Sequence, residues 1–329
     1  MRKTKPVFFS GIIIGVFIAL SILIVVQKIF FNELHANQKV NVNFVDVESF
    51  GANGTDLNDD SLAIQKAIDY SAKSKIGKVK LQGNKNYILT RGIKIKEGVT
   101  LEFDQNTRLY IEGNFRGIEV EKNASIYNGI IEVSSPEFDD EVIYLNGSEQ
   151  FWSSTRTNIS NVTIVNSSER NKGTGIKLVS EKSGDFISFT NFQDIEIIGF
   201  YNGVRLISTQ QGSKAEGGYS YINGNRFINL TLDDCVSCIE IVSSATVPNE
   251  VSGNEFSGLQ IQISKATKKI LTVSGSNNRF EAMVWDTQLL EKQSPIIVFT
   301  DQSAYSLLTS NLQENFISDR GNSNKYLSN

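Results

Sequence analysis

The sequence contains very few of the residues from which common catalytic and metal centres are built. Among its 329 residues there is one histidine, His35, and there are two cysteines, Cys235 and Cys238. So few ligands and nucleophiles exclude a zinc site, a Ser-His-Asp triad and a Cys-His dyad in the body of the chain. Any chemistry must therefore depend on carboxylates, Arg, Lys, Tyr or a hard cation.

The sequence also lacks an excess of positive charge. It has 32 Lys and Arg against 36 Asp and Glu, which gives a formal net charge of -4. Binding to DNA or RNA depends on clustered basic residues, so we expect no nucleic-acid partner. The two cysteines form a lone C-x-x-C pair without a βαβ context, and we expect buried thiols rather than redox chemistry.

Proline is scarce, and short apolar runs alternate with turn-forming residues. The chain has only 4 Pro but 20 Phe and 10 Tyr. Aromatic residues favour strands, and clusters of Asn, Ser and Gly between them are typical of turns. The composition therefore predicts an all-β fold.

One long hydrophobic run stands near the N-terminus. Residues 8–26 contain no charged side chain, and a helix of this length spans roughly the 30 Å hydrocarbon core of a bilayer. Arg2, Lys3 and Lys5 precede the run, which by the positive-inside tendency predicts a cytoplasmic N-terminus and an extracytoplasmic body. A cleaved signal peptide, which would make the protein secreted, is the alternative.

These signals divide the chain into three parts. We expect a cytoplasmic stub and transmembrane signal-anchor at 1–31, a stalk at 32–43 that includes His35, and one folded domain at 44–329. The protein is then a single-pass cell-membrane protein.

The start of the folded domain predicts one helix followed by short strands. Ala63, Ile64, Ala67 and Ile68 share one face of a helix over 59–72, which Asp59 or Asp60 would cap. Alternating apolar residues then predict strands at 79–81, 87–89, 93–95, 99–101 and 109–111.

These residues carry a family resemblance. The segments FGANG at 50–54, NDD at 58–60 and AIQKAI at 63–68, with the strands up to residue 101, resemble the opening of the pectate lyase superfamily, which includes rhamnogalacturonase-related and polygalacturonase-related proteins. Phage tailspike proteins open similarly. The resemblance implies a right-handed parallel β-helix capped by the 59–72 helix, a polysaccharide partner and, by analogy with tailspikes, a trimer.

A weak repeat extends through the rest of the domain. Phe192, Phe227, Phe256 and Phe280 are each followed by apolar residues at plus three and plus five, which fits coils with loops of variable length. These offsets predict inward-facing side chains, Trp285 included. Asn225, Asn254 and Asn278 recur just before the Phe positions and predict a buried asparagine ladder.

Strand alternation then predicts an outward row of carboxylates. Glu196, Asp233 and Asp286 fall at outward positions, and Asp233 and Asp286 would lie about 10 Å apart on coils two steps removed. Paired carboxylates near this separation are typical of inverting glycosidases. Solvated surface carboxylates are the alternative interpretation. Arg205 and Glu216 are the supporting candidates for the catalytic set.

Exposed aromatic side chains are candidates for substrate binding. Trp152, Tyr219 and Tyr221 stand in irregular or Gly-rich stretches, where they would stack on sugar rings. The diagnostic motifs of polygalacturonases are missing, which argues against that chemistry in particular.

The leading hypothesis is a membrane-anchored, extracytoplasmic glycoside hydrolase or polysaccharide lyase that acts on a complex or acidic polysaccharide. A lyase would need Ca²⁺ to hold a uronate, but the sequence identifies no metal ligands. Two alternatives stay open: a non-catalytic polysaccharide-binding or surface-structural protein, and a uronate epimerase.

Overall fold

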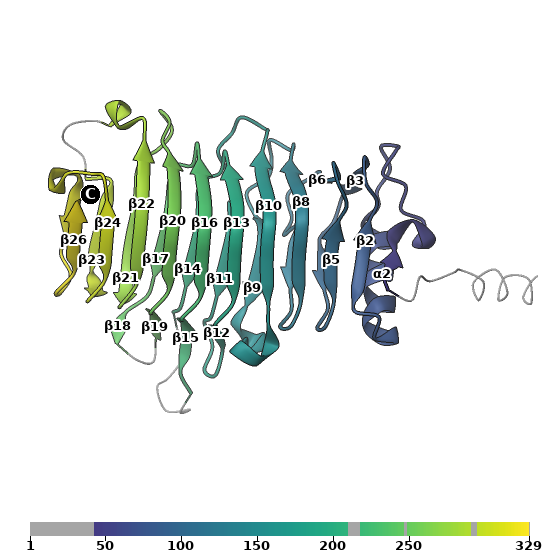
Figure 1. The fold of residues 1–329 in the computed structure, drawn as a ribbon, viewed down its shortest axis with the longest axis horizontal. Coiled ribbons are helices and arrows are strands. Elements are labelled where there is room, and N and C mark those ends of the chain that lie inside the picture. The colour runs from purple at the N-terminus through teal and green to yellow at the C-terminus, as the bar shows by residue number, and fades with distance from the viewer. Residues whose placement is uncertain (1–42, 210–217, 247–248, 291–294, 329) are drawn as a thin grey trace, which may run out of the picture. The chain divides into compact units, whose positions relative to one another are not determined.

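The computed structural model describes residues 43–209, 218–246, 249–290 and 295–328, which form stacked coils of parallel strands (Figure 1). The predicted anchor at 1–31, and all of the predicted stalk except Asn43, lie outside these residues. Within the described ranges, no helix has the length and apolar character needed to cross a membrane.

The coils build two sheets. Sheet 1 runs in the order β1 (Val45–Asp46), β2 (Lys78–Leu81), β5 (Thr100–Phe103), β8 (Ser125–Val133), β10 (Asn158–Asn166), β13 (Asn191–Ile198), β16 (Arg226–Asp233), β20 (Glu255–Gln262), β22 (Arg279–Trp285), β24 (Leu307–Ser310) and β26 (Lys325–Ser328), and β3 (Asn86–Leu89) and β6 (Arg108–Ile111) join it beside β8.

Sheet 2 contains the returning strand of each coil. Its order is β4 (Ile93–Ile95), β7 (Ile118–Val120), β9 (Glu141–Asn146), β11 (Thr174–Val179), β14 (Asn202–Ile207), β17 (Ser237–Val242), β21 (Lys269–Ser276), β23 (Ile297–Ala304) and β25 (Ile317–Asp319). At its edge lie β12 (Phe186–Ser188), β15 (Ser220–Asn223), β19 (Asn249–Ser252) and β18 (Ala245–Thr246). Among the strand pairs of the described ranges, only β18 with β19 is antiparallel. Short 3-10 turns are η1 (Val47–Phe50), η2 (Gly147–Glu149), η3 (Ser153–Thr155), η5 (Thr287–Leu289) and η6 (Glu314–Phe316).

The long strands of sheet 1 bend at one residue with left-handed backbone. The first half of β8 pairs with β5 and the second half pairs with β6, so β8 replaces two strands and a turn of the previous coil. Positive φ angles recur at this bend, at Asn128 (59°), Asn161 (54°), Asp194 (54°), Asn229 (56°) and Gly258 (66°). Asn, Asp and Gly are the residues that adopt this conformation at least cost.

The core between the sheets is formed by the predicted repeat. The rings of Phe192, Phe227, Phe256 and Phe280 are stacked, with centroids 4.5, 4.4 and 5.1 Å apart between neighbours. Asn225, Asn254 and Asn278 are fully buried. The Asn225 amide donates to Oδ1 of Asn254 at 2.9 Å, and the Asn254 amide donates to Oδ1 of Asn278 at 3.1 Å. The predicted ladder is confirmed.

The fourth copy of the repeat departs from the prediction. The pairing of β20 with β22 shifts between Phe256 and Leu259, so that Leu259 faces Ala282 and Ile261 faces Val284. After Phe280, the buried residues of β22 are therefore Ala282 and Val284. Trp285, predicted to face inward, is 50% exposed. The physical reason lies at the bend of β20, where the two residues Ser257 and Gly258 stand opposite a single residue of β22. The strand β22 therefore has one residue fewer at this point.

The helix α2 (Ser61–Ser74) covers the first coil, as predicted. It buries Ala63, Ile64, Ala67 and Ile68 and contacts β1, β2 and β4. Of the two predicted capping residues, Asp60 does not cap the helix with its side chain, whereas Oδ1 of Asp59 accepts from the backbone N–H of Ser61, the first helix residue, at 3.0 Å. Instead Asp60 accepts hydrogen bonds from the backbone N–H groups of Asn53 (2.8 Å) and Ile88 (3.0 Å). Cys235 and Cys238 are free and fully buried, as predicted.

Candidate functional site

Three predicted carboxylates gather on the outward side of sheet 1. Glu196 in β13 and Asp233 at the end of β16 alternate with the buried residues of their strands. Burial raises the pKa of Asp233, and the negative charges of Asp234, Glu196 and Asp286 raise it further. Asp233 therefore lies within electrostatic range of both Glu196 and Asp286, and we call these three residues the carboxylate face.

Trp285 lies at the carboxylate face because of the register shift. It follows Val284 on β22, pairs with Gln262 and precedes Asp286. Its indole N–H donates to Oε1 of Gln260 at 2.8 Å, and the amide of Gln262 donates to the Asp286 carboxylate. A half-exposed indole is thus held beside carboxylates and amides, a combination suited to a sugar ring and its hydroxyl groups. The sequence repeat predicted Trp285 to be a core residue, so it was not among the candidate site residues.

Two predicted supporting residues do not join this face in the described structure. Arg205 lies on β14 of sheet 2 and forms an ion pair with Glu240. Its predicted position near the acidic row is wrong, because the strand that carries it returns along the other sheet. Glu216 lies outside the described residues. Among the ion pairs of the described ranges, none includes Glu196, Asp233 or Asp286.

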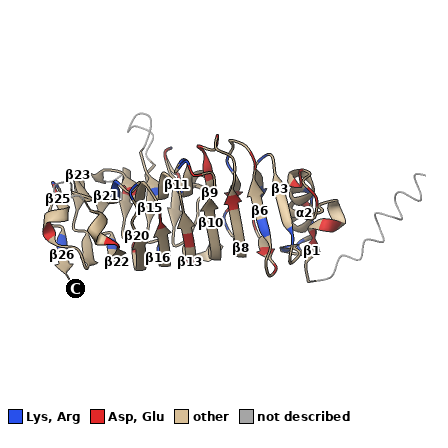
Figure 2. Cartoon of the chain, turned by 90° about the horizontal axis from the view of Figure 1, so that it is seen from above, with Lys and Arg blue, Asp and Glu red and all other residues tan. Residues whose placement is uncertain are grey.

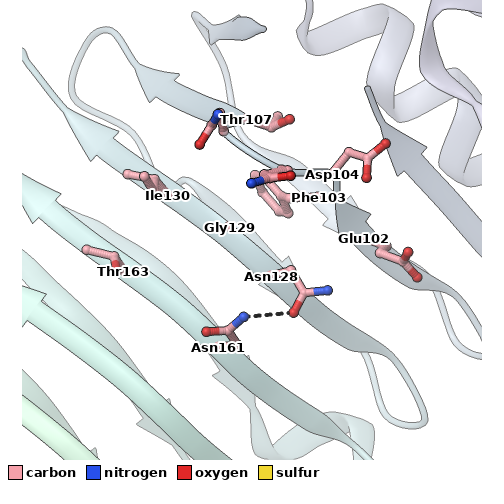
Figure 3. A pocket seen from close by; sticks show the side chains of 11 residues that line it. Glu102, Phe103, Asp104, Thr107, Asn128, Gly129, Ile130, Asn161 and Thr163 are labelled. Atoms are coloured by element: carbon pink, nitrogen blue, oxygen red, sulfur yellow. Dashed lines mark hydrogen bonds between the residues drawn. The ribbon is translucent and has the colours of Figure 1, made fainter. Parts of the chain in front are cut away.

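A groove on the same side of sheet 1 leads towards the carboxylate face. Its volume is about 390 Å³, and Asn128, Asn161 and Thr163 are among its lining residues (Figure 3). The Asn161 amide donates to Oδ1 of Asn128 at 2.9 Å, and the Thr163 hydroxyl lies 3.5 Å from Oε2 of Glu196. Thr163 therefore links the groove to Glu196 of the carboxylate face.

The floor of the groove depends on a residue without a side chain. A Cβ at Gly129 would lie 2.5 Å from the Phe103 ring. Two carboxylates at the groove, Glu102 and Asp104, form ion pairs with Lys78 (2.7 Å) and Lys80 (2.9 Å). The two lysines compensate the negative charge of these carboxylates. The side-chain amides of Asn128 and Asn161 are then the neutral hydrogen-bonding groups of the groove. Sequence reasoning missed this groove, although the asparagines at the strand bends were a signal for it.

The predicted aromatic residues lie around β12 and β15 at the edge of sheet 2, beside the start of the sheet 1 strands. Trp152 is 45% exposed and packs edge-on against Phe186 and Phe189, with centroids 5.9 and 5.1 Å away. Phe186 is stacked on Tyr221 at 5.2 Å. We call Trp152, Phe186, Phe189 and Tyr221 the aromatic ridge.

The structure separates this ridge from the carboxylate face. Tyr221 precedes β16, whereas Asp233 ends it, and the seven steps between the first and last of the eight residues of β16 extend about 23 Å. Figure 1 shows β12, β15 and β19 at the starting edge of the sheet 1 strands, away from their arrowheads. Tyr219 is exposed near the ridge, but no ring contact joins it to the ridge within the described ranges.

A second charged cluster, which the sequence analysis missed, lies at the start of β9. Glu141 is nearly buried and forms ion pairs with Lys177 and, at 3.3 Å, with Arg116. The Arg116 guanidinium also lies 3.5 Å from the Tyr144 ring centre. Figure 2 shows such basic and acidic residues interspersed along the strands.

Neighbouring carboxyl groups ionise differently in this cluster. Burial and a hydrogen bond with Glu141 raise the pKa of Asp140 to about 6. Burial opposes the charge of Glu141 as well, but the hydrogen bonds from Asp140 and Lys177 outweigh it and lower the pKa of Glu141 to about 2. Within the described part of the chain, no three His, Cys, Asp or Glu side chains are grouped to hold a metal ion.

The strand pairing defines a parallel β-helix protein, which is the fold implied by the resemblance to the pectate lyase superfamily. No protein-family model matches the chain. No curated protein matches it either.

Solved structures of the tailspike protein of E. coli bacteriophage HK620 are similar to this chain. One mutant in complex with a pentasaccharide is 13% identical and has a TM-score of 0.36, and the match covers 86% of this chain and 62% of the tailspike chain. Another mutant is 12% identical with a TM-score of 0.39, and the match covers 86% of this chain and 63% of the tailspike. This chain therefore spans less than two thirds of the tailspike length.

Proposed function

We propose that the protein binds a polysaccharide along the outward side of sheet 1 and hydrolyses it at the carboxylate face. The observation that carries the proposal is the pair Glu196 and Asp233 on adjacent coils, with the pKa of Asp233 raised by burial and by neighbouring negative charge. A raised pKa increases the protonated fraction of a carboxyl group and so favours Asp233 as the general acid, which leaves Glu196 for the role of general base.

The strand geometry gives this pair a suitable separation. Glu196 pairs with Thr231, two residues before Asp233. Two residues along a strand and one coil across it correspond to about 8 Å between Cα atoms. Inverting glycosidases place their carboxyl groups roughly 6.5–9.5 Å apart, which leaves room for a water molecule.

The proposed reaction uses the two groups in fixed roles. Asp233 donates its proton to the glycosidic oxygen while that oxygen leaves the anomeric carbon. Glu196 accepts a proton from water, and the water oxygen bonds to the same carbon from the opposite side. Trp285 and Gln260 hold the sugar ring. The products are two shorter chains, one of which has a new reducing end.

The charge of the site favours an uncharged substrate over an acidic one. Glu196, Asp233 and Asp286 have no ion-pair partner within the described ranges, and a polyuronate would be repelled by them. The extracytoplasmic location, with residues 8–26 as a membrane anchor, belongs to the proposal on the basis of the sequence alone.

The test is an assay of the full chain in detergent against neutral and uronate polysaccharides, following chain length, reducing ends and absorbance of unsaturated products. We expect shortening of a neutral polymer with new reducing ends. Glu196→Gln and Asp233→Asn should each lower kcat by about 10²–10⁴-fold, whereas Asp286→Asn should lower it less.

The exposed Asp301→Asn variant is the control and should keep full activity. An unsaturated product would replace hydrolysis with a lyase reaction. Altered sugar stereochemistry without new chain ends would indicate an epimerase. Retention of a polymer whose chain length and stereochemistry do not change would indicate a non-catalytic binding protein.

A further inference from the structure

We propose that the aromatic ridge is a second saccharide-binding site, which holds an uncharged stretch of polysaccharide by stacking on its rings. The site is distinct from the carboxylate face and does not depend on cleavage there. The groups that carry the proposal are the four rings of the ridge and one buried hydroxyl group, that of Ser188.

The ridge is a preorganised aromatic surface. Phe186 and Tyr221 pair in register on adjacent coils, and their rings are nearly parallel at 8°. Trp152 stands at 88° to Phe186 and at 87° to Phe189. Its backbone is held by Thr155, whose hydroxyl donates to the Trp152 carbonyl at 2.6 Å and accepts from the Trp152 N–H at 3.2 Å. Because these rings are already ordered, the binding of a ligand that stacks on them costs little conformational entropy of the protein.

Ser188 supplies the second observation. Its hydroxyl is the buried side-chain group without a hydrogen-bond partner among the described residues, and Ser188 is 1% exposed. Because Ile187 points into the core, strand alternation places Ser188 on the same side of β12 as Phe186. A buried hydroxyl without a partner is rare in native proteins and calls for an explanation. The proposal assigns a sugar hydroxyl as the missing partner, and because Ser188 is covered in the unliganded chain, the neighbouring rings must move apart to admit it.

The surroundings of the ridge fit a sugar better than an apolar protein surface. Polar groups flank the rings, including Gln150, whose amide donates to the Gly184 carbonyl at 3.2 Å, and Asn223, the register partner of Ser188. A pyranose ring combines an apolar face with hydroxyl groups at its rim, and half-exposed aromatics with a polar border match that pattern. We therefore assign a neutral polysaccharide as the occupant.

The ridge lies near the start of β16 and the carboxylate face at its end, so one polymer chain that follows this strand can contact both sites. When one site holds the polymer, the other binds it as an intramolecular step, so retention increases without any new contact. The ridge should therefore matter for long polymers and not for short oligosaccharides that reach only the carboxylate face.

The experiment measures retention of the full chain on neutral glucans, galactans and mannans. Trp152→Ala and Tyr221→Ala should each weaken retention at least tenfold. Ser188→Ala should weaken it too while raising the unfolding temperature, because it removes an unpaired buried hydroxyl; a merely structural role would not separate these two readouts. Tyr201→Ala, which removes an exposed aromatic outside the ridge, is the matched control and should change nothing.

Fluorescence provides a second measurement. The chain has 2 Trp, so Trp285→Phe leaves Trp152 as the reporter, and its emission should change when a retained polymer is added. The proposal is overturned if the unmodified chain retains no neutral polymer, if the ridge variants retain it equally well, or if Trp152 emission is unaffected. It is also overturned if sedimentation shows that Trp152→Ala disrupts an oligomer, because the ridge would then join copies of the chain. The proposed function is tested separately with Asp233→Asn. Loss of cleavage with unchanged retention in this variant would support catalysis at the carboxylate face and binding at the ridge as independent properties.

Discussion

Ionisation of single carboxyl groups in this protein depends on their position in the coil. Asp140 and Glu141 are adjacent in sequence, but only Glu141 contacts both Lys177 and Arg116. The two cations keep Glu141 charged, so the proton of the pair resides on Asp140. Because the pKa of Glu141 is lowered to about 2, its stabilising effect is complete above its unfolded pKa and is lost as the pH falls towards 2.

Asp140 should have the opposite effect on stability. Its pKa is raised from 3.8 to about 6, so the folded chain binds more protons than the unfolded chain between these values. The free energy of unfolding should therefore decrease as the pH rises from 4 to 6. Asp140→Asn imitates the protonated group and should raise stability at pH 7–8, by up to about 1 kcal/mol after allowance for solvent screening.

Urea denaturation at pH values from 4 to 8 measures this effect. The exposed Asp301→Asn variant is the control and should leave the pH profile unchanged. A profile for Asp140→Asn that is lowered equally at every pH would contradict the assignment, since it would show a lost hydrogen bond rather than a removed charge.

At the scale of the element, the turns into β16, β20 and β22 are held by the ladder of Asn225, Asn254 and Asn278. Asn254 donates to the Ile222 carbonyl (2.9 Å) and to Asn278, and it accepts from the backbone N–H of Asn225 at 3.0 Å. These bonds satisfy backbone groups that the turn takes out of the sheet, as buried polar groups require. The ladder therefore fixes the register of successive coils.

The Asn254→Ala substitution tests the ladder. It leaves several buried groups without partners, and we expect the free energy of unfolding to fall by about 2–4 kcal/mol. Asn58→Ala in an exposed turn should change stability by less than about 0.5 kcal/mol. Thermal and urea unfolding followed by circular dichroism would decide the matter, and equal effects of the two substitutions would disprove a special role of the ladder.

At the scale of the whole stack, each coil depends on its neighbours, and the first coil depends on α2. Repeat proteins need a polar cap on a terminal unit because its apolar face has no further repeat to cover it. Ile68 of α2 is fully buried against this face, whereas Leu62 of the same helix is half exposed. The helix therefore stabilises the stack through one face.

Substitution of these two residues compares the faces. Ile68→Ala should lower the free energy of unfolding by about 2–5 kcal/mol and should promote aggregation through the uncovered coil. Leu62→Ala should have little effect. Scanning calorimetry and light scattering measure both outcomes, and a stable, soluble Ile68→Ala variant would show that α2 is dispensable as a cap.

Much of the fold was predictable because its signals are local. The strand segments, the helix and the Phe repeat follow from alternation within a few residues, and Asn225, Asn254 and Asn278 could be identified by their constant position before that repeat. The location of Trp285 could not be derived in this way. It depends on Gly258 in the preceding coil, because one extra residue at a bend reverses the direction of every later side chain in the paired strand.

The candidate site was only partly predictable for the same reason. The sequence by itself determined the coil pattern, the capping helix and the outward direction of Glu196 and Asp233, all of which depend on residue spacing within one strand. Only the tertiary structure decided which residues of different coils share a surface. It placed Arg205 on sheet 2 and separated Trp152 and Tyr221 from the carboxylates, because the loops between strands set the path of the chain and no local period encodes them.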